Sequence, residues 1–263
     1  MLPYIEQPEL HIGPLALHAF GALVVCAVWV GTWVARRRTV RLGLSPTHLE
    51  GMLTWVLVLG FVCGHVLDAL LYEPSATLAH PLSLLWLWES QGSFGGFVGA
   101  VAGGAIYAHR HALRMATWRY LDVIAYAFPF GWIFGRLGCT VAYDHPGKPT
   151  SFFLGERYSD GFVRHNLGLE EAIVTVGIAA LFFALGRKPR PIGFFVATLA
   201  IVYAPVRFLL DTLRIDDARY GGWTPAQWGS IGLLVLGVVL LRLVPWLARR
   251  GDPASGGEGG NPA

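Results

Sequence analysis

Long apolar stretches separated by short polar segments dominate the sequence. A helix that crosses a bilayer needs about twenty mostly apolar residues. Six stretches approach this length, and a seventh is shorter and rich in glycine: 16–35, 52–72, 116–138, 169–186, 192–213 and 228–247, with 94–110 as the seventh. Glycine is tolerated in such a helix where neighbouring helices pack closely through small residues. The pattern therefore predicts an all-α integral membrane protein with seven transmembrane helices.

Basic residues gather after the first, third, fifth and seventh of these stretches. The clusters are Arg36 to Arg38 with Arg41, His109 to Arg114, Arg187 to Arg190, and Arg249 with Arg250. Seven crossings bring all four clusters to one side, and an excess of lysine and arginine marks the cytoplasmic side. Without the span at 94–110, two clusters would lie outside. We therefore expect the N-terminus outside, in the periplasm, and the C-terminus in the cytoplasm. The loops expected to face outward are 73–93, 139–168 and 214–227.

Three further segments complete this arrangement. PLSLLWLWE (81–89) is too short to cross a bilayer, and its tryptophans favour a place at headgroup depth. The segment 251–263 is poor in apolar residues and rich in glycine, which predicts a disordered cytoplasmic tail after a seven-helix domain over 1–250. We interpret the first span as a retained helix rather than a cleaved signal, because acidic residues precede it and three arginines follow it directly.

The composition agrees with a chain that resides in a bilayer. Of its 263 residues, 54% are hydrophobic and 14% are charged, which is more apolar than an ordinary soluble domain. The net charge of +3 comes from short clusters between apolar runs, so we expect no nucleic-acid partner. Cys26, Cys63 and Cys139 lie in or beside apolar stretches without CxxC spacing. We therefore expect no disulfide, no metal ion and no cofactor.

Polar groups of the predicted spans concentrate toward the outer ends. They are His18, His65, Asp68, Arg136, His165, Glu170, Glu171, Arg207, Asp211 and Gln227. Ionisable side chains inside a membrane are costly and usually serve a function. Their convergence on one level predicts a polar site near the outer face.

Two pairs of these residues have the spacing of partners on one helical face. Arg207 and Asp211 are four residues apart and in line with Tyr203, so an ion pair there would offset part of the desolvation of each. A salt bridge that only fixes helix packing explains this spacing equally well. His65 and Asp68 are three residues apart and invite the same pairing, although a lone histidine is more often a packing residue.

Arg136 differs from these residues because no acidic residue lies within one turn of it. A guanidinium without a local partner suits a phosphate, which it can grip with two parallel hydrogen bonds. The alternative is that the side chain snorkels to the headgroup layer. If Arg136 and Arg207 lie at the same depth on different spans, they would form a clamp for an anionic phospholipid headgroup.

The chain resembles a known family at these positions. GRLGC (135–139), with Asp144 five residues further on, is similar to the motif Gly-Arg-x-Gly-Asn followed by a glutamate in the prolipoprotein diacylglyceryl transferases. Tyr203, Arg207 and Asp211 match the family's late tyrosine, arginine and glutamate. The resemblance runs along most of the chain. It implies a seven-span enzyme of the bacterial inner membrane that moves diacylglycerol from phosphatidylglycerol to the lipobox cysteine of a preprolipoprotein.

Looser matches extend the resemblance. LHAFG (17–21) is similar to the start of the family's first span, with Phe20 where tyrosine is usual. HNLGLEE (165–171) resembles the family's His-Pro-x-Gln-Leu-Tyr-Glu and keeps its histidine and final glutamate. WTPAQWGS (223–230) resembles the segment that opens the last span.

The resemblance divides the site residues into two groups. Those expected to act in catalysis are Arg136, Arg207, Asp211 and Asp144, and those expected to bind substrate are Tyr203, His65, Asp68, Gly95, Gly96, His165 and Gln227. The two arginines would hold the phosphate of phosphatidylglycerol and stabilise charge on the departing glycerol phosphate. The other substrate would be the cysteine thiolate beside the signal peptide of a preprolipoprotein.

The chain also departs from the family's pattern. Phe94 stands where the family usually has a histidine just before the paired glycines, and that histidine is a leading candidate for the base that activates the acceptor thiol. Cys139 replaces an asparagine, and we interpret it as a small packing residue rather than a nucleophile. Replacement bases would be His65, His145, His165 or Asp144. The sequence does not choose among them, although a histidine suits neutral pH.

Two other functions fit parts of the pattern. A non-catalytic relative that binds anionic phospholipid or a lipoprotein precursor would keep the arginine clamp while its proton-transfer groups change. A small transporter is disfavoured because the sequence shows no internal repeat and no charges spread through the bilayer midplane. We expect the transferase.

Overall fold

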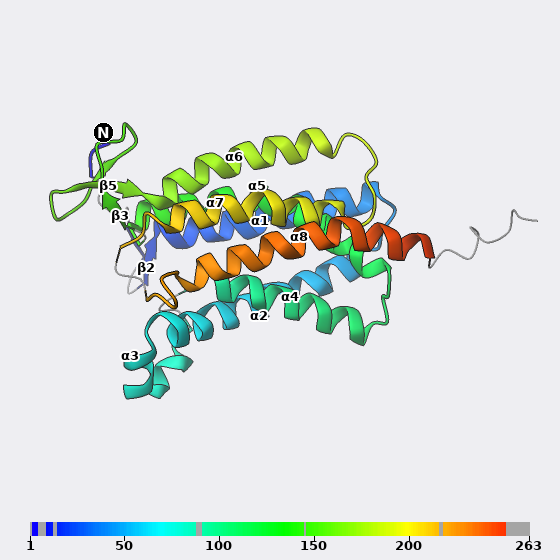
Figure 1. Ribbon diagram of the computed structural model, residues 1–263, viewed down its shortest axis with the longest axis horizontal. Helices are drawn as coiled ribbons and strands as arrows, with labels where there is room; N and C mark the ends of the chain where they lie inside the picture. Colours follow the sequence, from blue (N-terminus) through cyan, green and yellow to red (C-terminus); the bar gives the residue numbers. More distant parts are fainter. Residues whose placement is uncertain are drawn as a thin grey trace, which may run out of the picture.

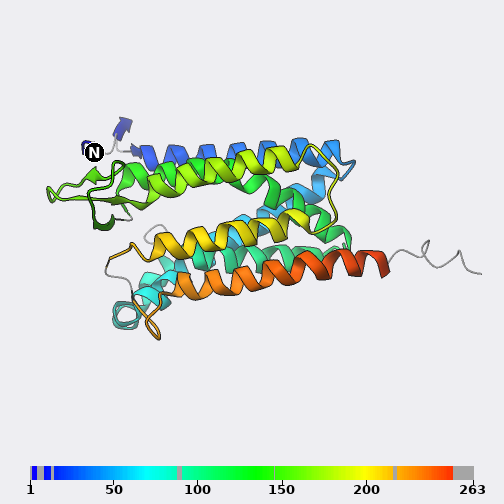
Figure 2. The same cartoon turned by 45° about the horizontal axis from the view of Figure 1, so that its top comes forward.

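Long helices make up most of the computed structural model, which describes residues 2–4, 9–12, 15–87, 91–144, 146–215 and 218–250. These helices lie side by side with their axes roughly aligned (Figure 1, Figure 2). They are α1 (Ala19–Arg41), α2 (Pro46–Tyr72), α4 (Ser93–Arg110), α5 (Ala116–Ala142), α6 (Leu167–Leu185), α7 (Phe194–Asp211) and α8 (Pro225–Arg250). Each apolar stretch predicted from the sequence falls largely on one of them, so the prediction of a mostly helical membrane protein is confirmed.

Five of the helices are long and apolar enough to cross a membrane. They are α1, α2, α6, α7 and the Pro225–Leu247 part of α8. The other two long helices are more polar or shorter: α5 carries Arg119, Asp122 and Arg136, and α4 has 18 residues and ends in His109 and Arg110. The chain therefore has the helices of a multi-pass membrane protein.

Several helix ends differ from the limits of the apolar runs. α2 begins at Pro46 instead of residue 52, because proline is well suited to the first helical position and the polar residues after it also form helix. α5 continues to Ala142 and ends where Tyr143 takes a left-handed conformation with a φ of 53°. Helix ends follow such capping geometry, whereas the sequence prediction followed apolarity.

Close packing of α4 on α2 explains the glycine-rich sequence of α4. A methyl group added to Gly95 would lie 2.3 Å from the Cys63 carbonyl oxygen, and one added to Gly99 would lie 2.1 Å from the Leu59 carbonyl oxygen. Gly96 is less crowded, with the Gly60 carbonyl oxygen 3.8 Å from such a methyl group. The two backbones are thus in contact through positions without a side chain, as in small-residue helix pairs of membranes.

A half-buried carboxylate joins α5 to the first turn of α7. Asp122 of α5 accepts hydrogen bonds from the backbone N–H groups of Gly193, Phe195 and Val196 at 2.6, 2.9 and 3.0 Å. A helix N-terminus has unsatisfied N–H groups and favours a negative charge. Asp122 therefore fixes the start of α7 against α5, at the end of the bundle remote from the strands (Figure 1).

Short strands lie at the opposite end of the bundle, beyond the end of α5 and the start of α6 (Figure 1). β3 (Pro146–Pro149), β5 (Val163–Asn166) and β4 (Glu156–Arg157) form an antiparallel sheet in the order β3-β5-β4. β1 (Glu9–Ile12) pairs with β2 (Leu15–His18). The sequence prediction named no strand here, because segments of two to four residues are too short to show a clear strand pattern.

The loop between α2 and α4 contains α3 (Pro74–Ala79) and the 3₁₀ helix η1 (Pro81–Leu85). Its apolar side chains are unusually exposed: Leu78 is 79% exposed, and Leu82 and Leu85 are each 71% exposed. The predicted interfacial segment 81–89 falls on η1 and the residues after it. Residues 88–90, His145 and the predicted tail 251–263 lie outside the described residues.

Candidate functional site

Glu171, in the second turn of α6, is the centre of a buried polar cluster. It is 2% exposed, and its Oε1 lies 2.9 Å from Nε of Arg136 on α5. The same oxygen accepts hydrogen bonds from the Tyr203 hydroxyl of α7 at 2.6 Å and from the Trp132 indole N–H of α5 at 3.0 Å. A carboxylate with three donors on one oxygen is strongly held.

Arg136 is buried inside the bundle, with 3% of its surface exposed. Its Nη1 lies 3.7 Å from Sγ of Cys139, and its guanidinium stands 4.6 Å from the centre of the Trp132 ring. Arg136 has no acidic residue within one turn of its own helix, but it has an acidic partner on a neighbouring helix. Glu171 is remote in sequence, yet the packing of α6 on α5 places it beside the guanidinium. The buried position also differs from that of a side chain that snorkels to the surface.

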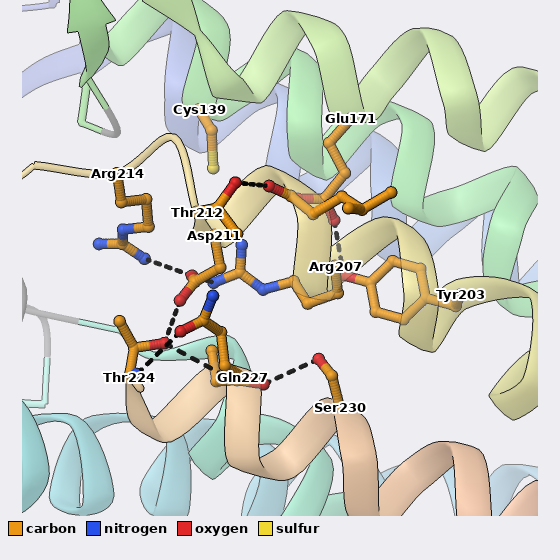
Figure 3. A network of polar contacts seen from close by, with 12 residues as sticks. Cys139, Glu171, Tyr203, Arg207, Asp211, Thr212, Arg214, Thr224, Gln227 and Ser230 are labelled. Atoms are coloured by element: carbon orange, nitrogen blue, oxygen red, sulfur yellow. Dashed lines mark hydrogen bonds and ion pairs between the residues drawn. The ribbon is translucent and has the colours of Figure 1, made fainter. Parts of the chain in front are cut away.

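The predicted ion pair on α7 is present. Nη2 of Arg207 lies 2.9 Å from Oδ1 of Asp211, and both side chains are buried. Asp211 also accepts a hydrogen bond from the Thr224 hydroxyl, and Nη1 of Arg214 lies 3.9 Å from its Oδ1. Figure 3 shows these side chains converging between α7 and α8.

Both clusters form one network, because Tyr203 and Arg207 are one turn apart on α7 and the Arg207 and Glu171 charges interact. Glu171, Tyr203, Arg207 and Asp211 lie together in Figure 3, with the sulfur of Cys139 pointing toward them. Arg136, Arg207 and Arg214 face the two carboxylates Glu171 and Asp211, so three positive charges meet two negative ones. The network thus carries a formal charge of +1 and suits an anion.

Gln227 has a local partner at the start of α8. Its Oε1 accepts from the backbone N–H of Thr224 at 3.1 Å, while its own N–H donates to the Thr224 hydroxyl at 3.1 Å. This reciprocal pair is a capping box, and Pro225 occupies the first helical position. The contacts of Gln227 place Thr224, which donates a hydrogen bond to Asp211. The substrate-binding role of Gln227 stays a prediction.

The predicted residues of α2 and α4 contact each other's helices and the loop that joins them. His65 is 2% exposed, and its Nε2 lies 3.1 Å from the Ser83 carbonyl oxygen of η1. The Asp68 carboxylate lies against Gly92, where an added methyl group would be 2.4 Å from Oδ1. Gly95 serves the packing of α4 on α2. Their contacts orient the loop between α2 and α4 and the start of α4, and their binding role stays a prediction.

Phe94 occupies the first turn of α4 and packs against α8. A methyl group on Gly229 would lie 2.4 Å from the Phe94 ring. The ring therefore fills the contact between these two helices, beside the segment that contains Gln227 and Ser230.

Asp144 and His165 lie outside the helices, just after the end of α5 and just before the start of α6. Asp144 is exposed just after the end of α5, where its carboxylate interacts with the Cys139 thiol through a hydrogen bond. Nδ1 of His165 lies 2.6 Å from Oε1 of Glu170, and its ring stacks on Phe152 at 5.9 Å between centroids. His145, another candidate base, lies outside the described residues.

Sequence reasoning placed Glu171 among the converging polar groups but gave it no catalytic or binding role, and it did not place Trp132 or Thr224 in the site. A signal for Glu171 was present, because it closes the HNLGLEE segment (165–171) and begins an apolar run. An acid at that position needs a buried partner. For Trp132 and Thr224 the sequence held no such signal, because a tryptophan within a membrane helix and a threonine just before a helix are both common.

The fold and the network define a multi-pass helical membrane protein with a buried arginine and carboxylate network suited to an anionic ligand. The chain belongs to the prolipoprotein diacylglyceryl transferase family, whose model matches residues 8–243.

Three relatives share the name phosphatidylglycerol–prolipoprotein diacylglyceryl transferase. The protein from Bordetella parapertussis is 32% identical, and the match covers 90% of this chain and 95% of the relative. The protein from Cupriavidus metallidurans is 30% identical over 96% and 97% of the two chains. The protein from Pseudomonas savastanoi pv. phaseolicola is 29% identical over 97% and 98%. The similarity therefore extends along nearly the whole of each chain.

Proposed function

We propose that this chain transfers diacylglycerol from phosphatidylglycerol to the lipobox cysteine thiol of a preprolipoprotein. The observation that carries the proposal is the network of Arg136, Glu171, Arg207 and Asp211, which joins three helices in a member of this family. The names of the relatives supply the two substrates.

The reaction replaces one bond at the glycerol carbon of the diacylglyceryl group. The acceptor sulfur forms a thioether to this carbon as the bond from carbon to phosphate oxygen breaks, and glycerol phosphate leaves with the electron pair. Arg136 and Arg207 would bind the phosphate and stabilise the charge that develops on it. Glu171 and Asp211 hold the two guanidinium groups in place before the lipid arrives, which is the preorganisation that such catalysis needs.

The thiol proton must pass to a base, and Asp144 is our preferred acceptor. Its carboxylate is exposed and interacts with Cys139, whose sulfur lies 3.7 Å from Nη1 of Arg136. His65 is less suited, because it is buried and its Nε2 lies 3.1 Å from the Ser83 carbonyl oxygen. His165 is held by Glu170 and could orient the acceptor peptide.

We further propose that all seven long helices cross the bacterial inner membrane, with the N-terminus and the strands on the outer side. Support comes from the positions of the basic clusters, which follow α1, α4, α6 and α8. In this orientation the network lies near the outer leaflet, where exported preprolipoproteins present their signal peptides. Reporter fusions after residues 43, 145, 189 and 250 test the topology, since the second alone should report an outer location.

The direct test of function combines purified protein, phosphatidylglycerol and a lipobox peptide. The proposal expects a diacylglyceryl-modified peptide by mass spectrometry and no product from Arg136→Ala or Arg207→Ala. Arg164→Ala is the matched control, because Arg164 pairs with the exposed Asp160 on the sheet and should leave product formation unchanged. Folded protein that binds phosphatidylglycerol without forming product would favour the non-catalytic relative. Rescue of a cell depleted of its own transferase gives an independent answer.

A further inference from the structure

A second buried network joins the end of α5 to the start of α6. At its centre is Glu156 of β4, which is 6% exposed. Its Oε1 accepts a hydrogen bond from the Tyr143 hydroxyl at 2.9 Å, and its Oε2 accepts one from Nδ2 of Asn166 at 2.5 Å. Tyr143 caps the end of α5 and Asn166 caps the start of α6. One carboxylate thus holds two helix ends.

Asn166 connects this network to the helix that carries Arg136. It is 1% exposed, and its Oδ1 accepts from the backbone N–H of Leu169 at 3.1 Å as an N-cap. Its Nδ2 also donates to the Thr140 carbonyl at 3.2 Å, and the Thr140 hydroxyl donates to the Arg136 carbonyl at 2.9 Å. The hydrogen bonds therefore run from Glu156 to the backbone at Arg136.

The two helices touch at this point because Gly168 has no side chain. A methyl group there would lie 2.7 Å from the Thr140 nitrogen and 3.1 Å from the Arg136 carbonyl oxygen. Glu171 follows Gly168 by about one helical turn and reaches Nε of Arg136 at 2.9 Å. The distance between the helix ends consequently sets the geometry of this ion pair.

Leu2, near the start of the chain, pairs with the same strand. The Leu2 N–H donates to the Gly155 carbonyl at 2.9 Å, and the Arg157 N–H donates to the Leu2 carbonyl at 3.0 Å. These bonds flank Glu156 on both sides. The ring of Tyr4 also lies 4.9 Å from that of Tyr143. Glu156 is therefore held by the backbone bonds of its two neighbours as well as by its side-chain partners.

We propose that Glu156 is a positioning residue for the transfer reaction, an inference that rests on the proposed function. Through Tyr143 and Asn166 it fixes the separation of the α5 and α6 ends, and so fixes how Arg136 faces both Glu171 and the phosphate. A displacement on the order of 1 Å in a site can lower a rate about a hundredfold, even when the altered residue is remote from the chemistry.

Glu156→Ala removes the acceptor for both donors. The expected result is a fall in kcat of about ten- to a hundredfold, with little change in the KM for the lipobox peptide. Glu156→Gln keeps a carbonyl oxygen for Asn166 and offers an amide donor to the Tyr143 oxygen, so most of kcat should remain. Asp160→Asn is the matched control, because Asp160 is an exposed carboxylate in the same region that pairs with Arg164.

A paired substitution separates this role from simple loss of stability. Asn166→Asp keeps a good N-cap for α6 but sets a second carboxylate against Glu156, so kcat should fall. Combining Asn166→Asp with Glu156→Gln restores a donor and acceptor pair, and kcat should recover in part although Thr140 still lacks its donor. Thermal unfolding of the same variants is measured in parallel, because residues in contact can also couple in stability; recovery of kcat beyond that of the unfolding midpoint supports the positioning role.

Amide hydrogen exchange provides a readout that does not depend on activity. In Glu156→Ala, exchange should rise at residues 139–143 and 167–171 and stay unchanged in α2. Wild-type protein that is folded but makes no product would overturn the proposed function. The exchange pattern would still support or refute the role of Glu156 in holding the ends of α5 and α6. Active wild-type protein with a normal kcat in Glu156→Ala, or without recovery in the paired variant, would overturn the positioning role.

Discussion

Nε of Arg136 lies 2.9 Å from Oε1 of Glu171, although the two residues belong to different helices and are both almost fully buried. Glu171→Gln would remove the negative charge and leave the guanidinium buried beside an amide. Breaking a buried ion pair in this way destabilises a protein by about 3–5 kcal/mol. The expected result is a clear fall in the thermal unfolding midpoint in detergent. Glu170→Gln is the control, and an equal midpoint for both variants would contradict the prediction.

Arg214 should determine how strongly the site prefers an anionic lipid. Arg136 and Arg207 each lie 2.9 Å from a carboxylate oxygen, and Arg214 adds a third guanidinium to the network, with its Nη1 3.9 Å from Oδ1 of Asp211. Arg214→Gln should raise the KM for phosphatidylglycerol about tenfold, which corresponds to about 1.4 kcal/mol of binding.

The matched control for Arg214 is Arg219→Gln, which alters an exposed arginine of the same loop that contacts the Gly222 carbonyl. KM values measured with mixed micelles of phosphatidylglycerol and a zwitterionic lipid provide the comparison. Equal changes in both variants would show that general surface charge, rather than the network, attracts the lipid.

Phe94→His restores an acid–base group at the start of α4, where the ring now packs against Gly229. A histidine with an ordinary pKa of about 6.5 accepts protons only when neutral. The transfer rate should therefore exceed that of the wild type, and the gain should grow as the pH rises through about 6.5. Phe94→Leu supplies an apolar control. A similar gain with leucine, or a gain independent of pH, would refute the role of the added imidazole.

Gly99→Ala should separate α4 from α2. The new methyl group would lie 2.1 Å from the Leu59 carbonyl oxygen. This oxygen belongs to the backbone, so it can move only if α2 itself shifts. Gly21→Ala is the matched control in α1, because no atom lies within 4 Å of its added methyl group. The control should be neutral or stabilising by up to about 1 kcal/mol from helix propensity. The midpoint of thermal unfolding should thus fall for Gly99→Ala and stay unchanged or rise for Gly21→Ala.

The helices could be predicted from the sequence because burial in lipid requires long apolar runs, and the glycine-rich run of α4 was recognisable for the same reason. The Arg207 and Asp211 pair could also be predicted, since its geometry depends only on helical spacing. These features are local, and local rules were sufficient for them.

The remaining contacts of the site depend on which helices are neighbours. Arg136 has no acidic residue within one turn of the sequence, because its partner Glu171 lies on α6. Gln227 has the spacing of a capping box with Thr224, yet only the structure shows that the box also holds Asp211. The strands were missed because they are short and pair through backbone groups, which leave little trace in the side-chain pattern.

The bond between Asp122 and the start of α7 limits how a lipid with two acyl chains can enter the site. Arg136 lies fourteen residues after Asp122, and Arg207 lies fourteen residues after Gly193. With their far ends joined, α5 and α7 cannot slide past one another. They can separate by a hinge-like rotation about the end that Asp122 joins. Pro129 and Pro205 lie between this end and the two arginines. The largest opening then falls at the opposite ends of α5 and α7, beside Arg136 and Arg207.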